Sequence, residues 1–390
     1  MSVRTLGPLT TFSISLRSAH RWFCMFMPLA LVLLLAGCGS GKAIFCTGTC
    51  IIQTGAEFVF ATTNNGEVAT LKVDTQTGSL GAPSMVSGPQ MSLGMAAAGF
   101  QHLYASDFGS AAIYGYSIDS TTGALTAVTG SPFSTGQFSV PAGLAATPNG
   151  SFLYTADALQ IDGYTIGSTG ALSPISGSPF SSDGSVQAFV SSAGFLYAAE
   201  DDPPGGVLAF SIGSTGTLTP IPGSPFLVPG QTVLNSHPFG VVADFLGKFV
   251  FLSLNQTNQI AVFSVDQSTG ILTSVPGSPF DAGALPSFLI RTGNYLYAMN
   301  SGDQTISAYS VDPTSGVLTP VSGSPFTAGA TGGMAINPEG TRLYAAAPAA
   351  GAIVGFTINS DGSLTPLDGS PFAITGPVLL TYVQMPSTGG

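Results

Sequence analysis

Charged residues are scarce in this 390-residue chain, which has 8 Lys and Arg, 19 Asp and Glu and 7% charged residues in all. Ordinary soluble domains carry about a quarter. The few cations and the formal net charge of −11 exclude a nucleic-acid-binding protein, because phosphates require Lys and Arg. Disorder is excluded as well, since it combines high charge with low hydrophobicity, whereas 44% of this chain is hydrophobic.

Long hydrophobic runs are also few. A polytopic membrane protein needs several apolar segments of about 20 residues, and this chain has one candidate, near its N-terminus. Gly (51) and Pro (28) together supply about one residue in five, which excludes a helical bundle because both destabilise helix interiors. Short strands joined by tight turns use these residues readily, so the composition favours an all-β fold.

The N-terminal segment has the pattern of an export signal. Residues 1–22 contain three Arg and no acid, 23–36 are apolar, and Leu-Ala-Gly-Cys follows at 35–38. This ending resembles a bacterial lipobox, which implies that residues 1–37 are removed and that Cys38 carries a lipid. Gly39, where Asp would signal retention at the inner membrane, implies an outer-membrane lipoprotein facing the periplasm or the cell surface. The alternative is an uncleaved signal-anchor helix.

Residues 38–56 then form a tether, in which Cys46 and Cys50 either close a small disulfide loop or stay free. No His or further Cys lies close enough to suggest a metal site with them. Removal of residues 1–37 leaves five basic and 19 acidic residues, a net charge of −14. Anionic headgroups repel such a body, so the lipid is the expected link to the membrane.

The rest of the chain is an internal repeat. Gly-Ser-Pro-Phe occurs six times, at intervals of 47, 46, 54, 46 and 46 residues. A turn of the type Thr-Gly-x-Leu precedes the first four copies, and Ser-Gly-Val-Leu (315–318) and Asp-Gly-Ser-Leu (361–364) take its place before the last two. A degenerate first copy has Thr-Gly-Ser-Leu at 77–80, which makes seven units. The motif copies end at Phe133, Phe180, Phe226, Phe280, Phe326 and Phe372.

Each unit contains four short apolar runs separated by turn residues. Four strands per 46 residues, repeated seven times, predict a seven-bladed β-propeller over residues 57–384, with a short tail at 385–390. The first unit begins at a second strand (57–62), and a lone apolar run remains at 378–383. We therefore predict that the C-terminal run supplies the innermost strand of blade 1 and closes the ring of a monomer.

These motifs resemble one family in particular. The Leu-Tyr-x-x-Asn/Asp strand, the Thr-Gly-x-Leu-Thr-Pro turn and the Gly-Ser-Pro-Phe end are similar to those of the seven-bladed lactonase-type propellers, which include 6-phosphogluconolactonase-like and muconate-cycloisomerase-like proteins and YVTN-repeat surface proteins. The resemblance covers about residues 57–384. It implies ligand binding at one rim of the ring and, in the enzymes, a His used together with Arg and Glu.

Strand order places the candidate site residues on that rim. Within each blade, the strands are counted from the axis outward. The rim that carries the turns from the second to the third strand, and the connections that lead into each first strand, is called the "site rim". The other rim is called the "opposite rim". A His beside carboxylates suits water-driven opening of a lactone, so His237, Glu200 and Asp157 are the catalytic candidates. Asp107, Asn255 and Asn300 are the binding candidates. The alternative for His237 is that it merely begins a strand beside Pro238.

The basic residues are expected elsewhere. Lys248, Arg291 and Arg342 fall at turns of the opposite rim, and the acids are expected on the site rim. A phosphorylated lactone or a muconate requires cations in the site. Relatives often have Pro-Arg-His where Pro238-Phe239 follow His237 here, which also argues against phosphogluconolactone.

Three functions remain open: a lipid-anchored, non-catalytic binding propeller, which we favour; a hydrolase of a neutral sugar lactone; and a subunit of an envelope assembly. No cofactor, metal ion or nucleic acid is expected. The acidic run 200–202 could bind Ca²⁺ through its oxygens, but such runs in loops are usually solvated.

Overall fold

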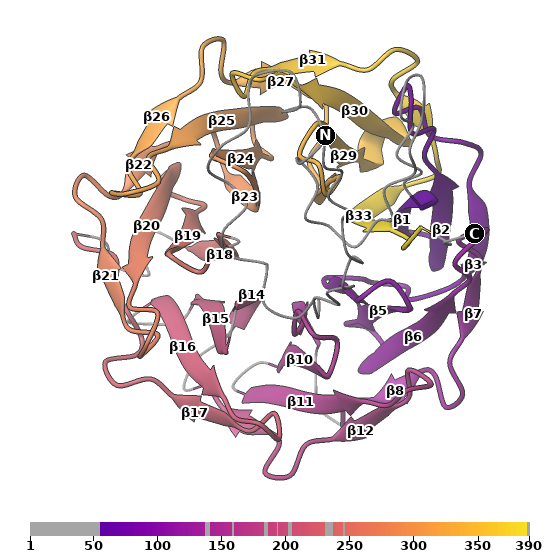
Figure 1. The fold of residues 1–390 in the computed structure, drawn as a ribbon, viewed down its shortest axis with the longest axis horizontal. Coiled ribbons are helices and arrows are strands. Elements are labelled where there is room, and N and C mark those ends of the chain that lie inside the picture. Colours follow the sequence, from indigo (N-terminus) through magenta and orange to yellow (C-terminus); the bar gives the residue numbers. More distant parts are fainter. Residues whose placement is uncertain are drawn as a thin grey trace, which may run out of the picture. The chain divides into compact units, whose positions relative to one another are not determined.

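The computed structural model describes residues 55–387 except for 137–140, 158–159, 183–185, 193, 202–204, 231–236 and 245. These residues belong to one compact unit, Gln53–Thr388; of Asp157 and of residues 186–192 only the backbone is described. The signal segment, Cys38, Cys46 and Cys50 lie outside the described residues. Within the described part, the strands form seven antiparallel sheets around a central axis (Figure 1), as the repeat predicted.

Each blade contains four strand positions, counted from the axis outward. The innermost strands are β33 (Pro377–Gln384), β4 (Met95–Ala98), β9 (Leu144–Ala146), β14 (Val186–Ser192), β18 (Pro238–Ala243), β23 (Pro286–Thr292) and β28 (Met334–Ile336). The second strands are β1 (Glu57–Thr63), β5 (His102–Asp107), β10 (Phe152–Asp157), β15 (Phe195–Glu200), β19 (Phe249–Leu254), β24 (Tyr295–Asn300) and β29 (Arg342–Ala347). The third strands are β2 (Glu67–Lys72), β6 (Ala112–Ile118), β11 (Gln160–Ile166), β16 (Gly206–Ile212), β20 (Gln259–Val265), β25 (Thr305–Val311) and β30 (Ala352–Ile358).

The outer position is filled by one short strand or by two. The outer strands are β3 (Ser84–Ser87), β7 (Leu125–Ala127) with β8 (Phe133–Ser134), β12 (Leu172–Pro174) with β13 (Phe180–Ser181), β17 (Leu218–Pro220), β21 (Leu272–Ser274) with β22 (Phe280–Asp281), β26 (Leu318–Pro320) with β27 (Phe326–Thr327), and β31 (Leu364–Pro366) with β32 (Phe372–Ala373). A single turn of 3₁₀ helix, η2 (Pro348–Ala350), follows β29. None of the helical segments in the described residues is long and apolar enough to cross a membrane.

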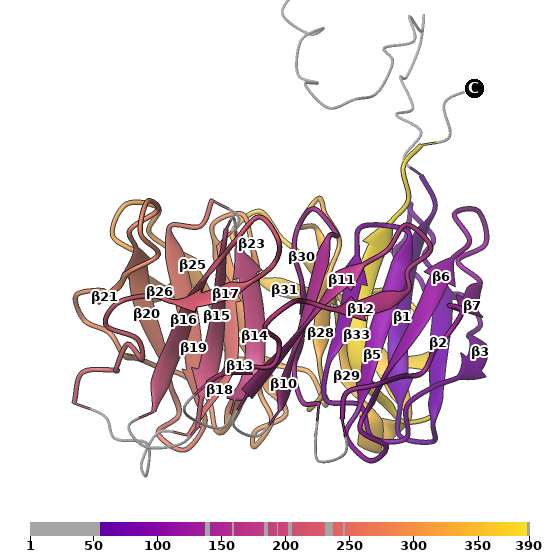
Figure 2. The ribbon, with the colours of Figure 1, turned by 90° about the horizontal axis from the view of Figure 1, so that it is seen from below.

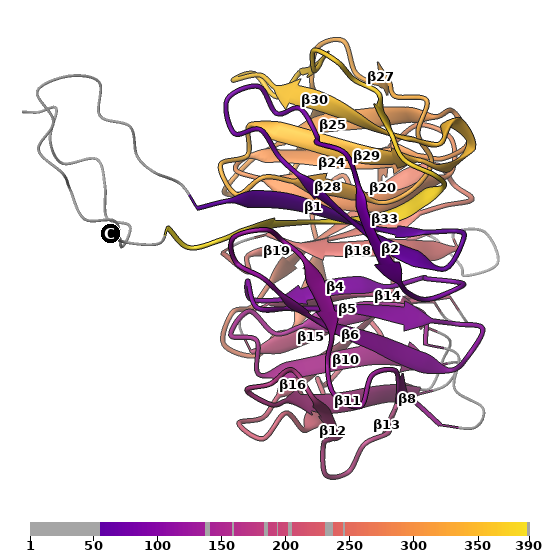
Figure 3. The same cartoon turned by 90° about the vertical axis from the view of Figure 1, so that its right-hand side faces the viewer.

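The ring closes through its two ends. β33 pairs antiparallel with β1, from Glu57 opposite Gln384 to Thr62 opposite Leu379, and it occupies the innermost position of blade 1. This confirms the predicted role of the C-terminal run. β1 begins and β33 ends on the same side of the ring (Figure 2, Figure 3), where the amide of Met385 donates to the carbonyl of Ala56 at 2.8 Å. Every strand of the seven sheets thus lies within residues 53–388.

The Gly-Ser-Pro-Phe motif divides the outer strand instead of ending it. The Ser–Pro peptide is cis in all six copies, and the chain resumes pairing with the third strand at the Phe. Across the break, the Ser hydroxyl accepts the third-strand N–H at 2.8–3.0 Å and so replaces the missing backbone acceptor. The residues that act in this way are Ser131, Ser178, Ser224, Ser278, Ser324 and Ser370.

A second repeated contact joins neighbouring blades. The Tyr of each Leu-Tyr pair is at most 1% exposed, and its hydroxyl donates to the carbonyl of the turn Gly in the next blade at 2.7–3.2 Å. Phe60 and Phe251 take the same place in blades 1 and 5. These aromatics therefore pack the blades, as their fixed strand positions predicted. The pairs are Tyr104–Gly170, Tyr154–Gly216, Tyr197–Gly270, Tyr297–Gly362 and Tyr344–Gly78.

Candidate functional site

The site rim has the geometry expected from strand order. The carbonyl of His237, just before β18, accepts the amide of Asn255, just after β19, at 3.0 Å. The start of an innermost strand and the end of a second strand therefore meet at one rim. His237 has a backbone φ of +43°, a region that His, Asn and Asp enter more readily than other non-glycine residues.

His237 contacts a carboxylate from the neighbouring blade. Its Nδ1 lies 3.0 Å from Oδ1 of Asp201 and 3.3 Å from Oδ2. The His237 side chain is 44% exposed and that of Asp201 is 23% exposed, so the pair lies at the surface of the rim. Because Nδ1 is engaged, the other ring nitrogen, Nε2, is the one that can face a ligand. The pairing joins blade 4, through the end of β15, to blade 5.

The sequence predicted Glu200 or Asp157 as the carboxylate that works with His237. Glu200 is the last residue of β15 and is 2% exposed, whereas Asp201 follows the strand and reaches the imidazole. The signal for Asp201 was present in the acidic run, but its contact depends on how blades 4 and 5 pack. Asp157 ends β10 in blade 3, and its side chain lies outside the described part of the structure.

The three binding candidates are placed differently. Asp107 is buried, and its carboxylate accepts the amides of Met91 and Gly109 and the hydroxyl of Ser110, so it supports the rim of blade 2. Asn300 is also buried and donates to hydroxyls within blade 6. Asn255 lies beside His237 and donates through Nδ2 to the carbonyl of Pro286 at 3.4 Å. Of the three, Asn255 is the one beside the His237–Asp201 pair.

The basic residues lie on the opposite rim, as predicted. In the described part of the chain these are Lys72, Lys248, Arg291 and Arg342, all at strand ends or turns of that rim. Arg342 donates to the carbonyls of Thr75 and Gln76 in blade 1, and the guanidinium of Arg291 lies 5.3 Å from the ring centre of Phe251. Both therefore serve the packing of the ring.

The expectation that the acids gather on the site rim is wrong. The turns between third and outer strands lie on the opposite rim, and they carry five carboxylates whose pKa is lowered by hydrogen bonds from the turn's own amides and hydroxyls. These are turn-forming residues, and they are Asp74, Asp119, Asp266, Asp312 and Asp361. What distinguishes the site rim, within the described residues, is the absence of Lys and Arg.

A cavity of about 330 Å³ opens along the ring axis from the site rim. The described part of its lining comes from six innermost strands and the residues just before them, and none of these residues is charged. Phe239 and Phe288 meet edge to face across blades 5 and 6, with ring centres 5.9 Å apart. Phe239, which lines the channel, lies two residues after His237, so the His237–Asp201 pair is close to the channel, although neither His237 nor Asp201 is among its lining residues. This lining was not predicted from the sequence. Side chains alternate between the two faces of a strand, but the sequence alone does not show which of them point toward the ring axis.

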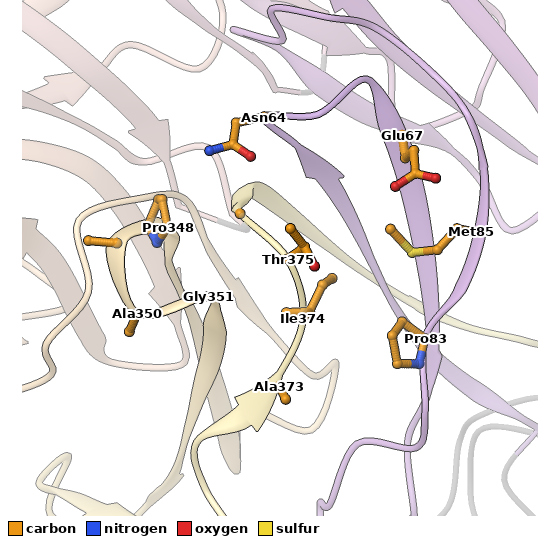
Figure 4. Close-up of a pocket in the computed structure, with 12 residues that line it drawn as sticks. Asn64, Glu67, Pro83, Met85, Pro348, Ala350, Gly351, Ala373, Ile374 and Thr375 are labelled. Carbon is orange, nitrogen blue, oxygen red and sulfur yellow. The ribbon is translucent and has the colours of Figure 1, made fainter.

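A larger hollow of about 710 Å³ lies between blades 1 and 7 (Figure 4). It is bounded by the turn after β1, by β3, by η2 and by the chain that leads into β33. Glu67 is the one ionisable residue in the described lining, and its carboxylate accepts a hydrogen bond from the side-chain amide of Asn65 at 2.8 Å. With no His in its lining, this hollow offers less chemistry than the channel mouth. The described residues also contain no group of three or more His, Cys, Asp or Glu placed to hold a metal ion.

Comparison with known proteins supports the family resemblance. The family model described as "Lactonase, 7-bladed beta-propeller" matches residues 241–332 and 288–385. No curated protein matches the sequence. Among solved structures, a periplasmic gluconolactonase of Pseudomonas aeruginosa is 18% identical, with a TM-score of 0.67 over 86% of this chain and 100% of that one.

Two further structures come from Bacteroides proteins provisionally assigned as 6-phosphogluconolactonases. The protein of Bacteroides uniformis is 20% identical, with a TM-score of 0.70 over 85% of this chain and 100% of that one. The protein of Bacteroides fragilis is 20% identical, with a TM-score of 0.68 over 84% and 98%. At these identities the likeness concerns the fold. The sequence match covers residues 241–385, and the likeness in fold covers 84–86% of the chain, so the chain is a seven-bladed β-propeller that is similar to the lactonase-type propellers.

Proposed function

We propose that this protein is a lipid-anchored propeller of the cell envelope that binds a small uncharged ligand at the mouth of the axial channel on the site rim. The observation that carries the proposal is the His237–Asp201 pair beside a cavity of about 330 Å³. The described site rim has no Lys or Arg to neutralise a phosphate or carboxylate. The Pseudomonas aeruginosa relative is named for gluconolactone, which is uncharged, and for the periplasm.

The anchor proposal depends on Cys38 and on where the chain joins the ring. Ala56 and Met385 meet on the opposite rim, so a lipid on Cys38 would hold that rim toward the membrane and leave the site rim facing away. Residues 38–55 can span at most about 60 Å when fully extended.

Replacing Cys38 by Ala tests the anchor. We expect the variant to appear in the soluble envelope fraction, whereas the parent chain and a Cys46→Ala control stay with the membranes, because a lipid contributes about 0.8 kcal/mol per buried CH₂. Membrane fractionation with an antibody against the propeller measures the distribution. Retention of the Cys38→Ala variant in the membrane would instead support the signal-anchor alternative.

A second candidate function, hydrolysis of a neutral lactone, is favoured by the same pair. His237, oriented by Asp201, can take a proton from water as the water oxygen bonds to the lactone carbonyl carbon. The ring C–O bond then breaks and the ring oxygen receives the proton, which gives a hydroxy acid. No cofactor enters this scheme.

Replacing His237 by Asn tests both functions, since Asn also tolerates the positive φ at this position. If the protein is a hydrolase, we expect the rate on glucono-δ-lactone to fall about a hundredfold or more. An Asp281→Asn control, which changes a rim carboxylate that contacts Gln259 at 3.4 Å, should keep the rate. Calorimetry of the unchanged protein should show lactone binding and no phosphogluconolactone binding. Lactone binding with no hydrolysis supports the binding function and not the hydrolase. The proposal is contradicted if no uncharged lactone, with or without an alkyl chain, binds.

A further inference from the structure

We infer that the ligand of the channel mouth carries an apolar chain, so that the substrate class is an alkyl-substituted lactone and not a sugar lactone. This inference rests on the proposed function and specifies its ligand. Among the described residues, the side chains that line the channel are almost all apolar, and Ser92 is the one that bears a hydroxyl. A sugar presents hydroxyls on every face, and this lining offers them few partners. The apolar side chains are Leu93, Met95, Leu144, Phe239, Val241, Phe288, Leu289, Met334, Val378, Leu379 and Leu380.

The entrance shares this character. Leu93 is 47% exposed at the mouth, and Met91 and Leu285, also on the site rim, are 53% and 42% exposed. Each precedes an innermost strand, β4 or β23, and Leu93 is the one of the three that lines the cavity among the described residues. Large apolar side chains that remain exposed around a hollow usually mark a binding surface. An apolar chain that enters here would cover surface that water now contacts.

Near the mouth of the channel, the backbones of neighbouring innermost strands lie in close contact. A Cβ at Gly240 would lie 2.1 Å from the carbonyl oxygen of Ser287, and a Cβ at Gly94 would lie 2.6 Å from the carbonyl oxygen of Ala142. Neighbouring innermost strands therefore approach each other at the mouth, and a ligand reaches this part of the channel along the axis. The resulting cavity is at the small end of the range for small-molecule sites.

Charge restricts the polar end of the ligand. Asp201 stands at the mouth, and the described residues of the site rim include no Lys or Arg. A fatty acid would bring its carboxylate close to that of Asp201, which would repel it. A lactone head is uncharged, accepts hydrogen bonds, and can meet Nε2 of His237 while its alkyl chain enters the channel.

A chain-length series tests the inference. The probes are γ-butyrolactone, γ-hexalactone, γ-octalactone and γ-decalactone, titrated calorimetrically into residues 53–388 carrying His237→Asn to prevent turnover. We expect affinity to rise about fourfold per added methylene until the channel is filled. Leu93→Gln should weaken γ-decalactone binding at least fivefold and leave γ-butyrolactone unchanged. Leu246→Gln is the matched control, because Leu246 is 62% exposed on the opposite rim.

The outcomes separate this inference from the proposed function. If glucono-δ-lactone binds and affinity does not rise with alkyl length, the inference fails and the proposed function stands. If no lactone binds, both fail. If affinity rises with length but Leu93→Gln and Leu246→Gln behave alike, the chain binds somewhere other than the channel and the inference is overturned.

Discussion

A chain that ends at Gly376 is expected to lose its folded structure. The deletion removes β33 and so the innermost strand of blade 1, together with its antiparallel pairing to β1. Four buried apolar side chains leave with it: Leu379, Leu380, Val383 and Met385. At about 1.5–3 kcal/mol each, their burial is comparable to the 5–15 kcal/mol that stabilises a whole domain. The edge of β1 would also be left unpaired.

Circular dichroism and thermal unfolding of residues 53–376 and 53–387 measure this effect. The longer chain retains all of β33 and should melt as residues 53–388 do. The shorter one should show no cooperative transition and should expose apolar surface. A cooperative transition within a few degrees of the control would mean that six complete blades and a partial seventh form a stable ring without the closing strand.

Alkaline pH is expected to unfold the ring over a narrow range above pH 10. Burial raises the pKa of the five tyrosines that join neighbouring blades above their usual value of 10. Below pH 10 these hydroxyls are protonated in both the folded and the unfolded chain, so their full contribution to the free energy of unfolding is present. Above pH 10 the unfolded chain loses these protons first, and the free energy of unfolding falls as pH rises toward the folded pKa.

The size of the effect follows from the number of sites. Each tyrosine that is ionised in the unfolded chain and neutral in the ring lowers the free energy of unfolding by up to about 1.4 kcal/mol per pH unit. Five of them can therefore remove the stability of a typical domain within about two pH units. Urea unfolding at pH 8, 9, 10 and 11 should give a constant midpoint up to about pH 9.5 and a steep decline beyond it.

The double variant Tyr297→Phe, Tyr344→Phe tests whether these tyrosines are responsible. Phe60 and Phe251 already fill the equivalent place in two blades, so the substitution fits. At pH 8 the variant should lose about 1 kcal/mol for each hydrogen bond removed, and its decline above pH 10 should be shallower than that of the parent. Parallel declines in the two proteins would assign the alkaline transition to other groups.

Most of the fold could be predicted because it repeats. The spacing of Thr-Gly-x-Leu and Gly-Ser-Pro-Phe gave the number of blades, and the unmatched run at 378–383 gave the closure. The function of the Gly-Ser-Pro-Phe serine could not be predicted. Its hydroxyl accepts a hydrogen bond from an N–H about 15 residues earlier in the chain, in the third strand. This contact depends on how the outer strand is aligned with the third strand after the chain turns back, which the sequence motif does not show.

The candidate site was predictable only in part. His237 could be assigned to the site rim because it begins an innermost strand, and that assignment holds. Glu200 and Asp201 are adjacent at the end of β15. Beyond the last residue of a strand, side chains no longer alternate between the two faces of the sheet, so the sequence does not show which of the two carboxylates contacts His237. The apolar lining of the channel needed the ring itself, since its residues come from six blades that are distant in sequence.

The sequence by itself determined the scarcity of charge, the seven units, their strand order and the rim on which the cations lie. All of these depend on local spacing and on the handful of residues that turns require. The tertiary structure alone decided that Asp201 meets His237, that acids occupy both rims, and that the axial channel is apolar. These are contacts between blades, and the distances between blades depend on how the side chains and glycines of one sheet pack against the next.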